Sequence, residues 1–152
     1  MYILDYFKKF EDKNIKMFVD MDGVIADYEV GVAEKFHLKR PLYSSLEKLK
    51  EISNMNNVEL FILSVTRKDE GNAQKQEWLD KYAPFFAKEN RVILSRESNA
   101  GKSSSELKST YIKNLERDGS VIIVIDDDPR VLFAIKETSD DVYLLKDTAL
   151  VD

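Results

Sequence analysis

Five short apolar runs rich in branched residues recur along this chain of 152 residues, with polar stretches between them. They occupy residues 17–19, 60–63, 92–94, 121–125 and 142–145. Each run is too short for a helix. Continuous apolar runs of this length are typical of strands that are buried on both faces of a parallel sheet. The sequence therefore predicts five buried strands.

The stretches between these runs show the three- and four-residue apolar spacing of amphipathic helices. Ser103 and Glu106 have the spacing of a capping box, and Pro129 stands where a first helical turn would begin. The alternation predicts a three-layer, Rossmann-like α/β fold, with a parallel sheet of about five strands and helices on both faces. The helical stretches contain, in order, Leu46, Leu49 and Ile52; Trp78, Leu79 and Tyr82; Leu107, Tyr111, Ile112 and Leu115; and Leu132 and Ile135.

The composition limits the chemistry that this chain can use. It contains no cysteine and a single histidine, His37, which excludes disulfides, thiolate nucleophiles and sites with several histidines. The net charge of −5 gives no overall positive field that would hold a nucleic acid or an anionic membrane. Because no apolar run approaches the roughly 18 residues of a membrane span and no signal-peptide pattern is present, we expect no membrane contact and a cytoplasmic location. The length predicts one domain, residues 1–152.

Acidic side chains follow two of the predicted strands at the point where each strand ends. Asp20 and Asp22 come directly after the first strand, and Asp126 and Asp127 follow the fourth. The carboxyl ends of parallel strands meet at one edge of the sheet, so these four side chains should lie close together. Clustered carboxylate oxygens suit Mg²⁺. The alternative is that the acids are solvated loop residues, with Asp127 or Asp128 capping the next helix.

Further polar groups would reach the same edge of the sheet. Ser64 follows the second apolar run, and its hydroxyl together with the backbone N–H of Val65 could hold a phosphoryl oxygen. Lys102 and Lys108 precede the fourth strand, and either ammonium could neutralise phosphate charge. The alternative for Ser64 is that it is a turn residue with no ligand, and the alternative for the two lysines is that they are solvated on the surface.

The order of these parts resembles the four motifs of the haloacid dehalogenase (HAD) superfamily. Asp-Met-Asp-Gly-Val at 20–24 resembles the first motif, Ser64 the second, a lysine the third and Asp126-Asp127 the fourth. The resemblance extends from about Ile15 to Leu145. Within the superfamily, residues 19–28, 76–79 and 125–127 are most similar to the 5′(3′)-deoxyribonucleotidase group.

The resemblance implies a Mg²⁺-dependent phosphomonoester hydrolase that forms an aspartyl-phosphate on Asp20. Asp22 would protonate the leaving group and later activate water. Mg²⁺ would contact the Asp20 carboxylate, the Asp22 backbone carbonyl and Asp127 directly. Asp126 would contact these ligands without binding the ion or would bind the ion through a water molecule. Ser64 would hydrogen-bond the transferring phosphoryl group.

The third-motif lysine would balance the phosphate charge and orient Asp20. We favour Lys108 over Lys102, because Lys108 shares a helix face with Ile112 and Leu115, where a charged group needs a specific partner. A helix from Lys108 to Asp118 would also bring the Lys108 ammonium within reach of the carboxyl end of the fourth strand.

Only a small cap is predicted over this site. The insert at about residues 28–43 has room for one short helix and a turn, whereas deoxyribonucleotidases have a larger helical cap. Tyr28, Phe36 and Tyr43 could stack on a base or belong to the core, and His37 is expected to be a surface or packing residue. The open site could be closed by a second copy of the chain or by another partner.

Three functions are therefore open at this stage. The first is a phosphomonoesterase that acts on a small phosphorylated substrate, with nucleotides as the first guess. The second is a polynucleotide 3′-phosphatase-like end-processing enzyme, favoured by the small cap and disfavoured by the acidic charge. The third is a phosphoacceptor signalling module that resembles a response-regulator receiver, in which acids, a hydroxyl and a lysine also gather at strand ends.

Overall fold

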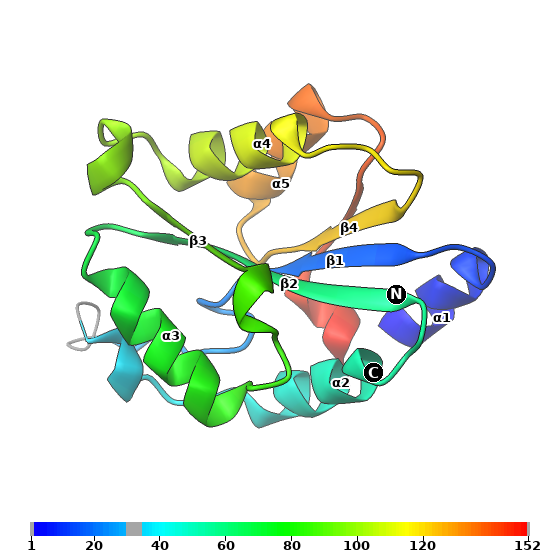
Figure 1. The fold of residues 1–152 in the computed structure, drawn as a ribbon, viewed down its shortest axis with the longest axis horizontal. Coiled ribbons are helices and arrows are strands. Elements are labelled where there is room, and N and C mark those ends of the chain that lie inside the picture. Colours follow the sequence, from blue (N-terminus) through cyan, green and yellow to red (C-terminus); the bar gives the residue numbers. More distant parts are fainter. Residues whose placement is uncertain (1, 30–34, 152) are drawn as a thin grey trace.

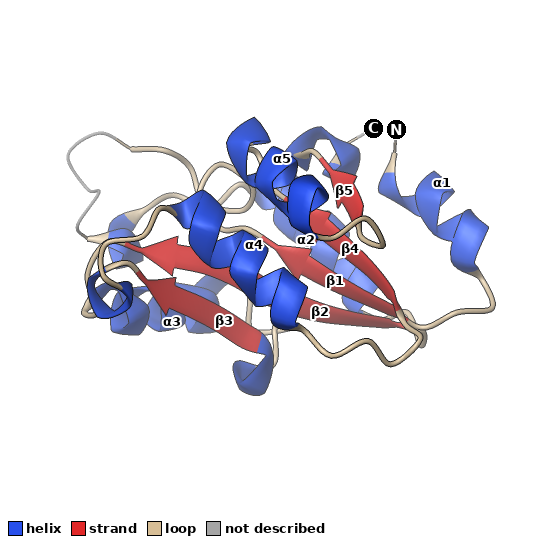
Figure 2. Ribbon diagram, turned by 90° about the horizontal axis from the view of Figure 1, so that it is seen from above, coloured by secondary structure: helices blue, strands red, loops and turns tan. Residues whose placement is uncertain are grey.

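The computed structural model describes residues 2–29 and 35–151, which form a sheet of five parallel strands (Figures 1 and 2). The strand order is β3-β2-β1-β4-β5, with β1 in the centre. The strand prediction is confirmed. The strands are β1 (Ile15–Val19), β2 (Val58–Thr66), β3 (Arg91–Ser95), β4 (Val121–Ile125) and β5 (Tyr143–Leu145).

Helices cover both faces of the sheet, as predicted (Figure 1). The chain runs from β1 through β2 to β3 with α2 (Tyr43–Ser53) and α3 (Gly71–Tyr82) on one face. It then crosses to the other side of β1, where α4 (Ser104–Asn114) and α5 (Pro129–Thr138) lie on the opposite face. This reversal beside β1 creates a crevice at the carboxyl ends of β1 and β4, which is where open α/β sheets bind their ligands.

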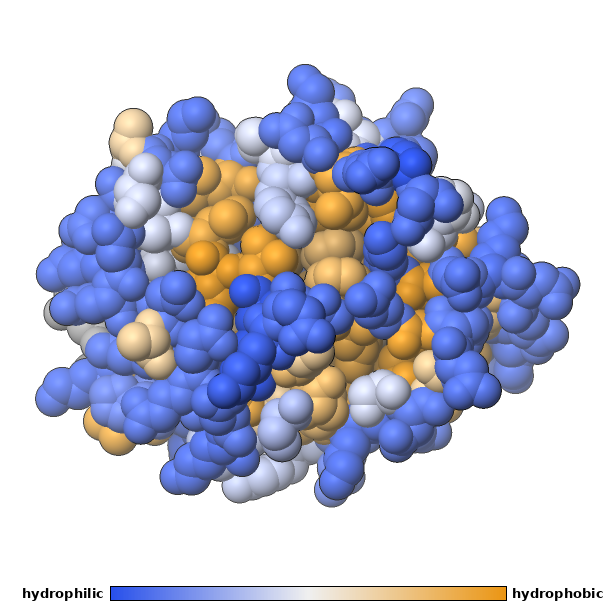
Figure 3. Space-filling model, in the orientation of Figure 1, coloured by the Kyte–Doolittle hydropathy of each residue, from blue (hydrophilic) through white to orange (hydrophobic). Residues whose placement is uncertain are grey.

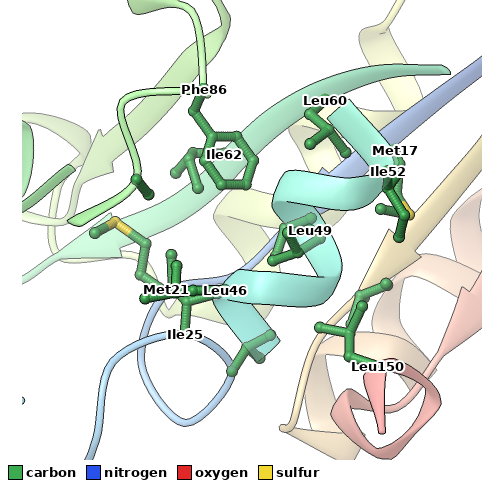
Figure 4. Close-up of a cluster of buried hydrophobic side chains, with 14 of the residues drawn as sticks. Met17, Met21, Ile25, Leu46, Leu49, Ile52, Leu60, Ile62, Phe86 and Leu150 are labelled. Atoms are coloured by element: carbon green, nitrogen blue, oxygen red, sulfur yellow. The ribbon is translucent and has the colours of Figure 1, made fainter. Parts of the chain in front are cut away.

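The alternating side chains of the central strand β1 divide the core into two clusters. Met17 and Val19 face the cluster formed with α2 and α3, whereas Phe18 faces the one formed with α4 and α5. Figure 4 shows Leu46, Leu49 and Ile52 of α2 within the first cluster. A strand that buries both faces must be apolar at every position, which explains why β1 and β4 appear in the sequence as continuous apolar runs.

The helix-end predictions are largely confirmed. The Ser103 hydroxyl caps α4 by accepting a hydrogen bond from the Glu106 N–H at 3.2 Å, and Pro129 is the first residue of α5. However, α4 does not extend to Asp118, because the chain is extended at Leu115. The Arg117 guanidinium instead donates to the carbonyls at the end of the helix.

The short elements close the ends of the layers. Helix α1 (Ile3–Phe7) packs the buried Ile3 and Phe7 side chains against the first cluster, which the apolar spacing did not predict. In the predicted insert, 30–34 lie outside the described residues. The remaining short elements are the 3₁₀ turns at Lys8–Phe10, Phe36–Leu38, Lys88–Asn90, Glu97–Asn99 and Asp147–Leu150.

The edge strand β3 is only partly covered. Four of its five residues are half-buried. Figure 3 shows, on the face of the molecule seen in Figure 1, apolar residues gathered near the middle with hydrophilic residues around them.

Among residues 2–29 and 35–151, no helix has both the length and the apolar character needed to cross a bilayer.

Leu49 tests the packing of α2 on the sheet. Its side chain is completely buried in the first cluster, so Leu49→Ala should lower the free energy of unfolding by about 2–5 kcal/mol through lost burial and a residual cavity. The exposed neighbour Lys50 is the control, and Lys50→Ala should change it by less than about 0.5 kcal/mol. Urea unfolding measures both. Equal effects for the two variants would contradict the packing described here.

Candidate active site

The first and fourth acidic motifs meet at the crevice beside β1. The Asp20 N–H donates to the Ile125 carbonyl at 3.0 Å, and the Asp126 N–H donates to the Leu145 carbonyl at 3.2 Å. The sheet hydrogen bonding therefore continues through both acids and fixes their backbones. This rigid attachment to the sheet places both carboxylates at the same edge.

A tight turn carries the chain away from Asp20. The Met21 carbonyl accepts hydrogen bonds from the N–H groups of Val24, Ile25 and Ala26, and Gly23 adopts a positive φ of 78°. A Cβ atom at Gly23 would collide with the Asp127 carboxylate and would lie 2.5 Å from Cε2 of Tyr28. Glycine is thus needed both for the backbone conformation and for the close approach of Asp127.

The Lys108 ammonium bridges the two motifs. Its Nζ lies 2.8 Å from Oδ1 of Asp20 and 2.7 Å from Oδ2 of Asp126, and all three side chains are buried. Although burial lowers the pKa of Lys108, the two carboxylates raise it above its ordinary value. Burial also raises the pKa of Asp20 to about 6, against the effect of Lys108. One ammonium therefore does not fully compensate the buried acids.

Three carboxylates gather around this point and could hold a divalent cation. Asp20, Asp126 and Asp127 each offer an oxygen atom within 4.8 Å of the others. Both Asp126 oxygens accept hydrogen bonds, from Lys108 Nζ and from the Asp128 N–H. Asp127 accepts one from the Tyr28 hydroxyl at 2.8 Å, while its buried Oδ1 has no hydrogen-bond partner in the described part of the chain.

This donor set fits Mg²⁺. The ligand atoms are all carboxylate oxygens, and burial raises the pKa of Asp126 and of Asp127. A divalent cation would relieve this destabilisation of the ionised carboxylates and would use the unpartnered oxygen of Asp127. The geometry thus suits the predicted direct role of Asp127 and a supporting role of Asp126.

The structure does not bring the Ser64 hydroxyl to the surface of the site. Ser64 is completely buried, and its Oγ accepts a hydrogen bond from Lys75 Nζ at 2.6 Å. Strand β2 continues for two residues beyond it, so Thr66 is the hydroxyl residue at the strand end. Val65 and Thr66 line the cavity described below. Thr66 is also buried, with its Oγ1 donating to the Leu94 carbonyl at 3.5 Å, but unlike Ser64 it lines the cavity.

Asp22 has a different neighbourhood from the one that the sequence suggested. It lies between two ammonium groups, because its Oδ1 pairs with Lys39 and its Oδ2 lies 3.5 Å from Lys75 Nζ. Its carboxylate is thus separate from the three clustered acids. Both lysines are buried, and each ammonium lies over the Phe36 ring, at 4.8 and 4.9 Å from its centroid.

Lys102 is not brought to the site. It is exposed in the turn before the cap of α4, and its carbonyl accepts a hydrogen bond from Arg96. The helix begins beyond Lys102, at Ser104, so only Lys108 is carried on its inner face toward the carboxylates. Of the two candidate lysines, the structure brings Lys108 into contact with the acidic motifs.

A cavity of about 410 Å³ opens over these groups. Tyr28 and Phe36 of the predicted insert contribute to its wall, whereas Tyr43 is exposed on α2. Phe36 packs edge-on against Trp78, as expected for a core aromatic, and His37 is half-buried. The charged lining residues are Asp20, Asp22, Lys39, Arg67, Lys68, Glu70, Lys75, Lys108, Asp126, Asp127 and Asp128.

Two lysines of the site were missed in the sequence. Lys75 lies one helical turn before Trp78 and Leu79, so a charged residue on an apolar helix face was available as a signal. The same argument singled out Lys108. Lys39 gave no comparable signal, because it lies in an irregular segment and is held in place by the Trp78 indole, which donates to its carbonyl at 2.9 Å.

Comparisons with known proteins agree with this architecture. Neither a protein-family model nor a curated protein matches the sequence. Among solved structures, one of the RNA repair complex of Pnkp1, Rnl and Hen1 aligns with a TM-score of 0.66 and 14% identity, over 88% of this chain and 42% of that chain. The chain shares the fold of such proteins.

Two further structures are similar. The N-terminal part of a Bacteroides fragilis protein, containing a phosphatase domain complexed with Mg, has a TM-score of 0.56 and 16% identity, over 93% of this chain and 38% of that chain. A D,D-heptose 1,7-bisphosphate phosphatase from B. bronchiseptica, complexed with magnesium and phosphate, has a TM-score of 0.55 and 13% identity, over 89% and 94%. This chain spans less than half the length of the first two structures.

Magnesium binding can be tested without an assay of catalysis. If Mg²⁺ binds the folded chain, it should raise the free energy of unfolding by about 2.7 kcal/mol at one hundred times its Kd. Asp127→Ala removes the carboxylate with the unpartnered oxygen and should abolish most of this increase. Urea unfolding with MgCl₂ and with EDTA measures it, and the exposed Asp12→Asn is the control. An undiminished increase in Asp127→Ala would exclude this site.

Proposed function

We propose that this chain is a Mg²⁺-dependent phosphomonoester hydrolase of the HAD superfamily, with Asp20 as its nucleophile. The observation that carries the proposal is the position of the Asp20 carboxylate. It is fixed at the end of β1, contacts Lys108 at 2.8 Å and faces a cavity large enough for a small phosphate ester. The Mg-complexed phosphatases of the same fold support this reading.

In the first step, an Asp20 carboxylate oxygen attacks phosphorus and the bond to the ester oxygen breaks. The products are an aspartyl-phosphate and an alkoxide, which takes a proton from the Asp22 carboxyl and leaves as an alcohol. Asp22 is two residues beyond Asp20 and lines the same cavity. This proximity is what a proton donor to the leaving oxygen requires.

In the second step, Asp22 accepts a proton from water as the water oxygen attacks phosphorus. The bond between phosphorus and the Asp20 oxygen breaks, which releases inorganic phosphate and restores the Asp20 carboxylate. The proton that Asp22 gave to the leaving group is thereby replaced. One carboxyl can serve as acid and then as base because the two steps are mirror images about phosphorus.

Charge balance is the main requirement for attack by a carboxylate on a phosphate dianion. The Lys108 ammonium supplies one positive charge beside Asp20. Thr66 lines the cavity at the end of β2, and its hydroxyl would turn from the Leu94 carbonyl to donate to a phosphoryl oxygen. The Asp20 and Asp127 carboxylates and the Asp22 carbonyl would hold Mg²⁺, which supplies further charge neutralisation when it is bound.

The strand order disfavours the receiver alternative. Receiver domains of the flavodoxin-like class have the order 2-1-3-4-5, whereas this sheet has the order 3-2-1-4-5. The substrate remains a proposal. Mononucleotides are the first compounds to test, and 3′-phosphorylated oligonucleotides and small phosphorylated metabolites are the other members of the assay panel.

Asp20→Asn tests the nucleophile directly. The amide keeps the shape of the side chain but cannot form the acyl phosphate, so kcat for p-nitrophenyl phosphate should fall by about 10³-fold or more. Wild-type turnover should require Mg²⁺ and stop in EDTA. Asp12→Asn, which changes an exposed acid ahead of β1, is the matched control. A stable phosphoprotein without turnover would instead support a signalling module.

A pair of lysine variants tests the assignment of the third motif. Lys108→Met removes the ammonium between Asp20 and Asp126, so kcat/KM should fall by about 10²-fold or more. Lys102→Met should retain activity to within about twofold, because this side chain is exposed and away from the carboxylates. Steady-state kinetics on p-nitrophenyl phosphate measure both. The opposite order of losses would assign the role to Lys102.

A further inference from the structure

Lys75 is a buried ammonium that the proposed mechanism does not use. Its side chain extends from α3 to the carboxyl end of β2 and is 3% exposed. The Nζ atom lies 2.6 Å from Ser64 Oγ, 2.9 Å from the Val65 carbonyl oxygen and 3.5 Å from Asp22 Oδ2. Two of the three ammonium protons have acceptors on β2, and Asp22 lies at ion-pair distance.

These contacts fix the direction of the ammonium. Ser64 and Val65 belong to a sheet strand and cannot move easily, so they hold Nζ at a defined point beside the turn after β1. An ammonium only donates, so the Ser64 oxygen must be the acceptor. Ser64 is thus placed to act on Lys75 rather than on a ligand.

The Asp22 carboxylate is the solvent-exposed end of this arrangement. It is partly exposed to the cavity, with 27% of its side-chain surface accessible, whereas Lys75 is buried behind it. Lys39 pairs with the other carboxylate oxygen, Oδ1. The two ammoniums therefore restrict the rotation of the carboxylate plane from opposite oxygens.

We propose that Lys75, anchored by the buried Ser64 hydroxyl, is a positioning residue that orients Asp22 toward the leaving-group oxygen. This inference rests on the proposed function, because it assigns Asp22 the acid and base role. It gives Ser64 a structural reason to be polar although its side chain is completely buried. It also gives Lys75 a different role from Lys108, because Lys108 contacts Asp20, the proposed nucleophile, whereas Lys75 contacts Asp22.

The kinetic test compares two aryl esters of similar size but different leaving groups. A poor leaving group needs protonation, so Lys75→Met should lower kcat/KM for phenyl phosphate about tenfold more than for p-nitrophenyl phosphate. Ser64→Ala should show the same selective loss. The double variant should lose little more than Lys75→Met alone, because both residues act through one contact.

A binding measurement gives a readout that does not depend on turnover. Orthovanadate bound to a carboxylate presents an apical oxygen where the leaving group would lie, whereas tetrahedral phosphate does not. Lys75→Met should therefore weaken orthovanadate binding by about tenfold while changing the affinity for inorganic phosphate by less than about threefold. Isothermal titration calorimetry with Mg²⁺ measures both affinities. Lys81→Met, an exposed lysine on the same helix, is the matched control and should change neither.

The outcomes separate this inference from the proposed function. If Lys75→Met lowers kcat/KM equally for both esters, or weakens the binding of vanadate and phosphate equally, the proposed role of Lys75 is wrong. Turnover by the wild-type protein would still support the phosphatase. A wild-type protein that neither hydrolyses the esters nor prefers vanadate would overturn both. A thermal unfolding midpoint for Lys75→Met that is not below that of the wild type would exclude misfolding as the cause of a loss.

Discussion

The contact of one buried ammonium with two buried carboxylates organises this molecule. Lys108 reaches Asp20 and Asp126 from α4, which packs on one face of the sheet (Figure 1). Removing these charges from water costs free energy that the ion pairs only partly return, so they are poorly explained as a source of stability. Under the proposed function their value lies in chemistry, since they hold an Asp20 oxygen, the proposed nucleophile, at a fixed point on a rigid sheet.

Charges of opposite sign are arranged on either side of this point. Asp20, Asp126 and Asp127 form a region with an excess of negative charge, whereas Asp22 lies between the Lys39 and Lys75 ammoniums. The same cavity is thus lined by a cluster of carboxylates that could hold a metal cation and, beside it, by Asp22, which is paired with lysine ammoniums. This separation lets two carboxylates only two residues apart have different roles.

Much of this arrangement could be predicted from the sequence, because apolar periodicity reports burial directly. The alternation of apolar runs with helical stretches predicts the three layers of the fold. The apolar helix face around Lys108 indicates that its ammonium contacts the acidic residues at the strand ends. The position of Ser64 differs from the prediction because the apolar run ends at Leu63, while β2 continues through Ser64 and Val65 to Thr66. Lys39 could not be predicted, since its position depends on a hydrogen bond to Trp78 from a distant helix.

The turn at Gly23 links backbone geometry to the proposed cation site. The α-hydrogens of this residue leave room for the Asp127 carboxylate, which lies where any larger substituent would be. The positive φ of Gly23 and the Asp127 carboxylate, which follows β4 more than a hundred residues later, therefore depend on each other. A lineage that replaced this glycine would have to move the Asp127 carboxylate and rebuild the proposed cation site, even if the surrounding sheet remained intact.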